Sequence, residues 1–214
     1  MLMFQNRQQA GQQLAARLSS FREESDLLVI GLPRGGLPVA SEVSAALGTE
    51  LDVCLVRKLG VPWQPELAFG AIAEGGVRVI DAATVRECGL KASEIEAMVE
   101  KAQAEIERRS QLFRGSRKAS AVRGRTVLLV DDGIATGSTM LAAVRALRAS
   151  GAKKIVVAVP VGPRSTCKEL EAEADQVVCL ETPEPFYAVG SWYEDFTQVE
   201  DQEVQQILAA ALPR

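Results

Sequence analysis

The chain of 214 residues contains no histidine. This absence excludes Ser-His-Asp and Cys-His catalysis, HExxH zinc sites and all histidine acid–base chemistry. Cysteine is sparse, since Cys54, Cys88, Cys167 and Cys179 are far apart and form no CxxC pair. A zinc site or a disulfide framework is therefore not expected. This use of cysteine is typical of a reducing compartment, so we expect a cytoplasmic protein.

Long apolar runs and an excess of positive charge are also missing. No run approaches the roughly 18 apolar residues of a membrane span, and the polar start MLMFQNRQQAGQQ does not resemble a signal peptide. The net charge is -4, and the basic pairs at 108–109 and 153–154 stand alone. We therefore expect neither a membrane nor a nucleic-acid partner, and any site for a charged ligand must be built locally.

The order of apolar and amphipathic segments predicts an α/β fold. Strand-like apolar runs alternate with stretches of helical spacing, and the run TVLLV at 126–130 has no polar interruption on either face. This predicts one domain over 1–214 with a mostly parallel sheet flanked by helices, whose ligands bind beyond the carboxyl ends of the strands. The expected strands are 27–31, 51–57, 126–130, 155–160 and 176–180, and the expected helices are 5–18, 38–47, 93–114, 138–150, 163–174 and 201–212.

Two further stretches have distinct expectations. Residues 59–70 contain two prolines and two glycines and are predicted to form a loop, followed by a hairpin of short strands at 68–74 and 77–80. The 93–114 helix begins with a capping box of Ser93 and Glu96. Its apolar stripe either packs on the domain or forms a dimer contact.

The segment VLLVDDGIATGSTM, at 127–140, carries the chemistry. An apolar strand ends in Asp131 and Asp132, and a small loop leads into a helix. Free N–H groups at a helix start, with hydroxyls beside them, suit a phosphate, and Gly137 permits close approach of the backbone. The absence of a Walker-type lysine argues against a nucleoside-triphosphate loop. Two carboxylates that accept hydrogen bonds from vicinal hydroxyls, beside a phosphate site, describe a ribose 5-phosphate.

This segment resembles the signature of type I phosphoribosyltransferases, which bind 5-phosphoribosyl 1-diphosphate (PRPP). The resemblance implies that Asp131 and Asp132 hold the ribose hydroxyls and that 135–139 holds the 5-phosphate. Two other interpretations remain: a response-regulator receiver, disfavoured because no aspartate ends the next strand, and a surface turn, disfavoured because adjacent acids at the end of a buried strand need partners. The PRPP-binding set implied is Gly35, Gly36, Asp131, Asp132, Gly133, Ala135, Thr136, Gly137, Ser138 and Thr139.

A second Gly-rich turn and a pair of cations accompany this signature. In GLPRGGLPVA, the amides of Gly35 and Gly36 could face an anion with Arg34 alongside, and the family has its pyrophosphate loop here. Arg57 and Lys58 end the next expected strand and would help neutralise a diphosphate before a mobile catalytic loop at 59–70. The resemblance thus gives Arg34, Arg57 and Lys58 catalytic roles. An ordinary turn and a solvated strand end are the alternatives.

In this family the acceptor is recognised by a hood, a small region built from terminal segments of the chain, which here would be 1–26 and 181–200. The stretch ETPEPFYAVGSWYEDF offers Phe186, Tyr187 and Trp192 for stacking on a base-like acceptor, although it could equally pack on the sheet edge. Ala135 stands where purine-salvage members often have an aspartate, which argues mildly against a hypoxanthine- or guanine-type enzyme. The PRGG, RKLG and PEPFYAVGSWY segments resemble a little-characterised bacterial branch of predicted phosphoribosyltransferases, with the 92–115 helix as a possible insert.

The resemblance implies a Mg²⁺-dependent transfer of ribose 5-phosphate from PRPP to a nitrogenous small-molecule acceptor, with release of diphosphate. Mg²⁺ would be held by PRPP and water, with Asp131 and Asp132 touching it at most through water, so no direct protein metal site is expected. A homodimer is expected from the family. The alternatives are a PRPP-sensing regulator without turnover and an unrelated phosphosugar-binding domain.

Overall fold

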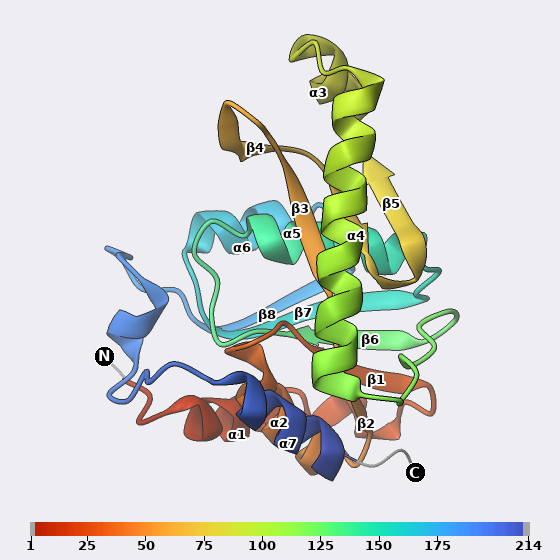
Figure 1. The fold of residues 1–214 in the computed structure, drawn as a ribbon. Helices are drawn as coiled ribbons and strands as arrows, with labels where there is room; N and C mark the ends of the chain where they lie inside the picture. Colours follow the sequence, from red (N-terminus) through yellow and green to blue (C-terminus); the bar gives the residue numbers. More distant parts are fainter. Residues whose placement is uncertain (1–2, 212–214) are drawn as a thin grey trace.

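Five parallel strands form the centre of the molecule in the order β2-β1-β6-β7-β8 (Figure 1). The computed structural model describes residues 3–211, so residues 1–2 of the expected hood and residue 212 of the expected C-terminal helix lie outside it. Because β1 pairs with β6, the turns that follow these two strands meet at one edge. The predicted α/β fold with a parallel sheet is confirmed. The strands are β1 Leu27–Gly31, β2 Glu50–Val53, β6 Thr126–Val130, β7 Lys154–Val161 and β8 Gln176–Glu181.

Helices cover both faces of this sheet (Figure 1). On β1, Leu27 and Val29 pack into the core on one face, whereas Leu28 and Ile30 pack into the core on the other. Two buried faces explain why these strands are apolar without alternation. One face carries α1 Arg7–Arg17, α2 Gly36–Leu47 and α7 Asp201–Ala210, and the other carries α5 Ser138–Ala149 and α6 Arg164–Leu170. The described residues also form the short 3₁₀ helices η1 Ser19–Glu23, η2 Glu74–Gly76 and η3 Val189–Trp192.

A second, antiparallel sheet stands beside the first, in the order β3-β4-β5. Its strands are β3 Val56–Val61, β4 Gln64–Ala73 and β5 Val77–Ile80. The predicted single strand at 51–57 was therefore wrong, because these residues belong to two strands, β2 and the start of β3, which lie in different sheets. The predicted loop at 59–70 was also wrong. Leu59, Val61, Phe69 and Ile72 are buried, and their packing in the main core holds the segment as a hairpin despite its prolines.

Helix α4, Ala92–Arg114, stands upright against this hairpin, with α3, Ala82–Glu87, above it (Figure 1). The predicted capping box was wrong: Glu94 caps the helix by accepting from the N–H of Lys91 at 2.8 Å, whereas Glu96 pairs with Arg78 at 3.0 Å. The apolar stripe of α4 is buried against β3, β4 and α7, as the first of its two interpretations required. This helix and the hairpin together form the upper part of the molecule.

Arg114, at the end of α4, ties the upper part to the central sheet. Its Nε lies 2.7 Å from Asp52 Oδ1 on β2, and its Nη1 lies 2.6 Å from Glu74 Oε2, just after β4. The side chains of Arg114 and Asp52 are only 2% and 3% exposed. Burial opposes the charged form of Asp52, but the hydrogen bond and charge of Arg114 hold the pKa of this carboxyl below its usual value. One guanidinium thus joins three elements.

The two terminal regions meet at the side of the sheet. The N–H of Phe4 donates to the carbonyl of Trp192 at 2.9 Å, and the N–H of Glu194 donates back to Phe4 at 2.8 Å. Helix α1 lies against α2, and Arg7 at its start also contacts the 181–196 segment, with its guanidinium over the ring of Phe196. No helix within residues 3–211 is long and apolar enough to cross a membrane.

Candidate functional site

The two Gly-rich turns pack directly against each other at the carboxyl edge of the sheet. A Cβ atom on Gly35 would overlap the Asp132 carboxylate, and one on Gly36 would lie 2.8 Å from the carbonyl oxygen of Val130. Neither position has room for a side chain. The glycine pair after β1 therefore lets the first turn lie on the acid pair after β6, as the adjacency of the two strands requires.

Asp131 and Asp132 differ in their partners. Asp131 Oδ1 accepts a 2.9 Å hydrogen bond from the N–H of Asp132 and, within residues 3–211, pairs with no cation. Asp132 Oδ2 accepts from Arg7 Nε at 2.7 Å. The Arg7 guanidinium also lies 3.9 Å above the centroid of the Phe196 ring, and Tyr193 Oη donates to the backbone carbonyl of Asp132 at 2.6 Å. Hood residues thus hold Asp132, whereas no cation contacts Asp131 within the described residues.

Burial and mutual repulsion act on this acid pair. Burial and then the charge of Asp132 raise the pKa of Asp131 well above its usual value. Burial also raises the pKa of Asp132, although the Arg7 guanidinium opposes the rise. Negative charge on this pair is therefore disfavoured in the unliganded protein, and a cation or hydroxyl donors from a ligand would stabilise it.

The loop after the acid pair presents unpaired amides. Gly137, with φ of 71°, is the N-cap of α5, and this left-handed conformation favours glycine. Among the residues that the structure describes, the backbone N–H groups of Ala135, Thr136 and Gly137 have no hydrogen-bond partner. Thr136 Oγ1 and Ser138 Oγ lie 2.9 Å apart beside them. Amides, hydroxyls and the positive end of a 12-residue helix are the groups that suit an anion.

The first Gly-rich turn is less available than the sequence suggested. The N–H of Gly36 donates to the carbonyl of Leu32 at 3.0 Å, so this amide does not face a ligand. The peptide between Pro33 and Arg34 is cis. The Arg34 guanidinium lies 3.7 Å from Glu200 and 3.6 Å from Asp201, at the start of α7. Arg34 is therefore paired with two acids instead of standing beside the amides.

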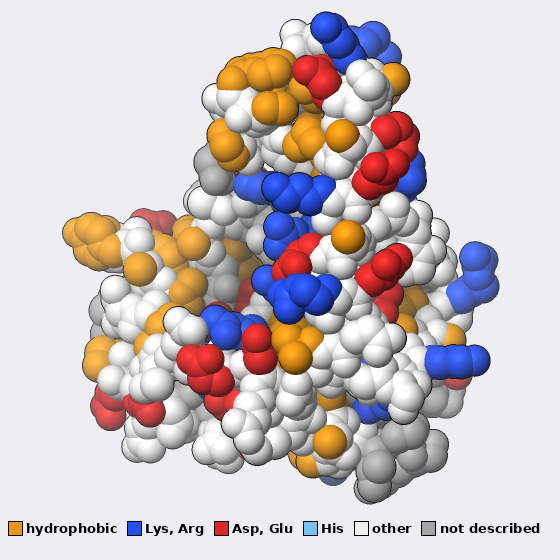
Figure 2. Space-filling model, viewed as in Figure 1, with side chains coloured by type: hydrophobic (Ala, Val, Ile, Leu, Met, Phe, Trp, Pro, Cys, Tyr) orange, Lys and Arg blue, Asp and Glu red, His pale blue; other side chains and the backbone are white. Residues whose placement is uncertain are grey.

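A cavity of about 280 Å³ lies between the first turn, the start of α5, helix α4 and the antiparallel sheet. Figure 2 shows Lys and Arg side chains gathered on this face beside α4 and the hairpin. Arg57 is exposed and Lys58 is half-buried, and both line the cavity although they alternate along β3. The structure thus places Arg57 and Lys58 in a cavity that Pro33 of the first turn and Thr139 of α5 also line. The lining residues used below are Pro33, Arg57, Lys58, Ile106, Arg109 and Thr139.

The three predicted acceptor residues lie in the hood but not in this cavity. Phe186 and Trp192 are partly buried against the hood cluster around Phe4 and Tyr193, whereas Tyr187 is 82% exposed. The Nε1 atom of Trp192 is buried without a hydrogen-bond partner among the described residues. A Cβ on Gly133 would lie 2.5 Å from Val189 Cγ1, so the hood packs directly on the segment after the acid pair.

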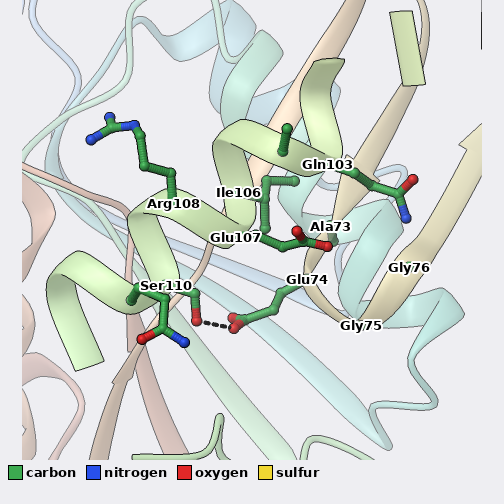
Figure 3. A pocket seen from close by; sticks show the side chains of 11 residues that line it. Ala73, Glu74, Gly75, Gly76, Gln103, Ile106, Glu107, Arg108 and Ser110 are labelled. Atoms are coloured by element: carbon green, nitrogen blue, oxygen red, sulfur yellow. Dashed lines mark hydrogen bonds between the residues drawn. The ribbon is translucent and has the colours of Figure 1, made fainter. Parts of the chain in front are cut away.

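A larger cavity of about 530 Å³ lies between α4 and η2 (Figure 3). In it, Glu74 accepts a 2.5 Å hydrogen bond from Ser110 Oγ, and Gln103 lies near Gly76. Arg108 points away from Glu74 and the two glycines. No residue that the sequence assigned to the site lines this cavity, so it is separate from the two turns.

Fold and geometry thus define an α/β protein with unpaired amides at a helix start, a buried acid pair and a cavity lined by cations. The phosphoribosyl transferase domain family matches residues 4–202. Two Mycobacterium tuberculosis proteins named "Putative phosphoribosyl transferase", MT0597 from strain CDC 1551 and Rv0571c from strain H37Rv, are each 49% identical over 211 residues, which cover 99% of this chain and 47% of the relative. The crystal structure of TT1426 from Thermus thermophilus is 41% identical, covers 98% of this chain and 99% of that chain, and has a TM-score of 0.91.

The chain belongs to the phosphoribosyltransferase family, which confirms the resemblance found in the sequence. It spans about half the length of the curated relatives that it matches.

Sequence reasoning missed several site residues. Arg7 and Tyr193 contact Asp132 from segments already expected to form the hood, but nothing in the sequence singled them out. Glu200 and Asp201 stand at the start of the expected 201–212 helix and were not assigned to the site. Arg109 lines the cationic cavity from α4 and was treated as one of an isolated basic pair. All of these depend on contacts between distant segments, which no local pattern encodes.

Proposed function

We propose that the protein is a Mg²⁺-dependent phosphoribosyltransferase that moves ribose 5-phosphate from PRPP to a nitrogenous acceptor and releases diphosphate. One observation carries this proposal: the acid pair and the free amides of the 135–137 loop follow one buried strand, and the cationic cavity reaches Thr139 just beyond them. The family supports the general reaction. PRPP carries a phosphate, a diol and a diphosphate, one group for each of these three features.

The phosphate and ribose fit the second turn. The amides and hydroxyls of 135–139 would bind the 5-phosphate at the start of α5. Asp131 and Asp132 would accept hydrogen bonds from the ribose hydroxyls, which supply the donors that Asp131 lacks. Gly133 would keep this segment packed under the hood.

The donor set also fits Mg²⁺. Within residues 3–211 no group of three His, Cys, Asp or Glu side chains forms a metal-binding cluster. Mg²⁺ accepts one or two carboxylates with substrate oxygens and water, and Asp131 offers a carboxylate that no cation contacts within the described residues. When bound with PRPP, the ion would neutralise charge on the departing diphosphate.

The leaving group fits the cavity. Arg57 and Lys58 would stabilise the charge that develops on diphosphate as the glycosidic bond breaks. Arg34 could join them only after leaving Glu200 and Asp201. The acceptor would enter from the hood side, where Phe186, Tyr187 and Trp192 offer rings. We also propose a cytoplasmic protein, supported by its four cysteines without a disulfide, and a homodimer on the family resemblance.

One observation favours a second candidate, a PRPP sensor without turnover. Arg34, the cation expected on the leaving group, is engaged by two acids instead of lining the cavity. Such a protein would bind PRPP tightly and release no diphosphate.

Calorimetry with PRPP tests the proposal, with and without Mg²⁺ and with ribose 5-phosphate and ATP as controls. A Mg²⁺-dependent preference for PRPP is expected, and a screen of bases and amides for diphosphate release then separates the enzyme from the sensor. Equal affinity for ATP and PRPP, or no binding of PRPP, would overturn the proposal.

A further inference from the structure

Helix α4 contributes to the cationic cavity although it belongs to neither Gly-rich turn. Ile106 and Arg109, three residues apart on one face of α4, line the cavity together with Pro33, Arg57 and Lys58. Ile106 is 3% exposed and packs in the main core, so it fixes this face of the helix toward the cavity. The position of Arg109 is therefore set by a buried neighbour.

We propose that Arg109 is a diphosphate-binding residue and that α4 thereby completes the leaving-group site. This inference rests on the proposed function and adds a third cation, from a different element, to the two on β3. The cavity adjoins both Pro33 in the first turn and Thr139 at the start of α5. An anion bound there would contact Arg109 from the side opposite the turns.

The Arg109 guanidinium is oriented before any ligand binds. Its Nε donates to Glu105 Oε1 at 2.8 Å, one helical turn earlier, and the side chain is 35% exposed. Neither terminal nitrogen has a hydrogen-bond partner among the described residues. Two free N–H-bearing nitrogens on a planar group match the paired oxygens of a diphosphate better than a lysine would.

Glu105 holds two arginines at once. Arg108 donates to it from Nε at 2.8 Å and from Nη2 at 3.0 Å, and the hydrogen bonds of Arg108 and then Arg109 lower the pKa of Glu105 to about 2. Glu105 is therefore ionised at every pH at which the protein would work. Arg108 is 60% exposed and does not line the cavity. Arg108 thus offers a matched control, with the same charge and the same partner outside the cavity.

Titration calorimetry with sodium diphosphate and Mg²⁺ tests the proposal on wild type, Arg109→Gln, Arg109→Lys and Arg108→Gln. Loss of hydrogen bonds to a charged group should weaken diphosphate binding by about 10- to 150-fold in Arg109→Gln. Arg109→Lys should recover part of the affinity. Arg108→Gln should stay within about threefold of wild type, because screening weakens an exposed charge. Ribose 5-phosphate affinity should be unchanged in all three variants.

The two levels of failure can be told apart. If wild type binds diphosphate and Arg109→Gln binds it as well as Arg108→Gln does, Arg109 has no role and the proposed function stands. If wild type binds neither diphosphate nor PRPP, both ideas are wrong. A general loss of fold would lower ribose 5-phosphate affinity and the melting temperature together, and that result would assign Arg109 a structural role instead.

Discussion

Replacing Asp131 by asparagine should stabilise the unliganded protein and destroy its ligand site. Burial and the charge of Asp132 raise the pKa of Asp131 in the folded state, so its ionised form costs folding free energy. Each unit by which the folded pKa exceeds the unfolded one is worth about 1.4 kcal/mol, or about 3–5 °C in Tm for a domain of this size. Asparagine keeps the shape and removes that cost. The lost charged hydrogen bonds should weaken PRPP binding by about 10- to 150-fold.

The difference in Tm between Asp131→Asn and wild type should depend on pH in a defined direction. The cost of the Asp131 carboxylate is fully present above its folded pKa and disappears as the pH falls through that value toward the unfolded pKa. The gain in Tm of Asp131→Asn over wild type should therefore be largest at neutral pH and shrink on acidification. Calorimetric melting of both proteins across the acidic-to-neutral range measures this difference.

Asp132→Asn is the matched control at the next position. Burial raises the pKa of Asp132 too, but Arg7, whose side chain is 11% exposed, opposes that rise. The substitution removes the charge partner of Arg7, so the Tm should be lower than that of Asp131→Asn. The reasoning is refuted if Asp131→Asn melts below wild type at neutral pH, or if its advantage grows as the pH falls.

Three further substitutions probe the contacts that build the site. Gly35→Ala should lower the free energy of unfolding by about 1–3 kcal/mol, because the new methyl group would overlap the Asp132 carboxylate. Urea denaturation measures this loss, and an unchanged midpoint would contradict the packing of the two turns. Arg114→Leu should lower the free energy of unfolding by about 3–5 kcal/mol, because Asp52 is left buried and unpaired. Adding Asp52→Asn to this variant should recover part of the loss. Strictly additive losses would mean that the two side chains do not interact. Tyr193→Phe should cost about 0.5–1.5 kcal/mol in the same assay, and no change would mean that its hydrogen bond to the Asp132 carbonyl contributes nothing.

The sequence predicted the central sheet because a strand buried on both faces has a continuous apolar run that can be recognised locally. The uninterrupted run at 126–130 became β6, and the run at 27–31 became β1 with the predicted bounds. The turns after these strands follow from fold geometry alone, since parallel neighbours end at the same edge. Residues 131–139 could therefore be placed without any knowledge of tertiary contacts.

The hairpin was missed because its signals conflict. Trp63 and Pro65 favour a loop locally, and Trp63 is indeed 64% exposed at the tip. Phe69 and Val61 are fully buried against elements distant in the sequence, and this burial outweighs the turn-forming residues. Tertiary packing thus overrode local propensity, as it often does in strands.

Side-chain partners were missed for a different reason. The sequence showed that Arg34 follows β1, but not that α7 would bring Glu200 and Asp201 within 4 Å of it. The same holds for Arg7, which reaches Asp132 across 125 positions. Charge alone identifies candidate cations, whereas the fold decides which acid or ligand each one meets.

The hairpin also changes how the negative charge on the departing diphosphate would be stabilised. A mobile loop supplies its cations only after it closes, and ordering it costs conformational entropy. Here Glu74, just after β4, is held by Ser110 and by Arg114, and Arg114 is held in turn by Asp52 on the central sheet. The base of the hairpin is therefore fixed to both α4 and β2, close to Arg57 at the start of β3. A backbone fixed in this way would present Arg57 without closure of a loop, and charge placed in advance provides large stabilisation in a site without histidine.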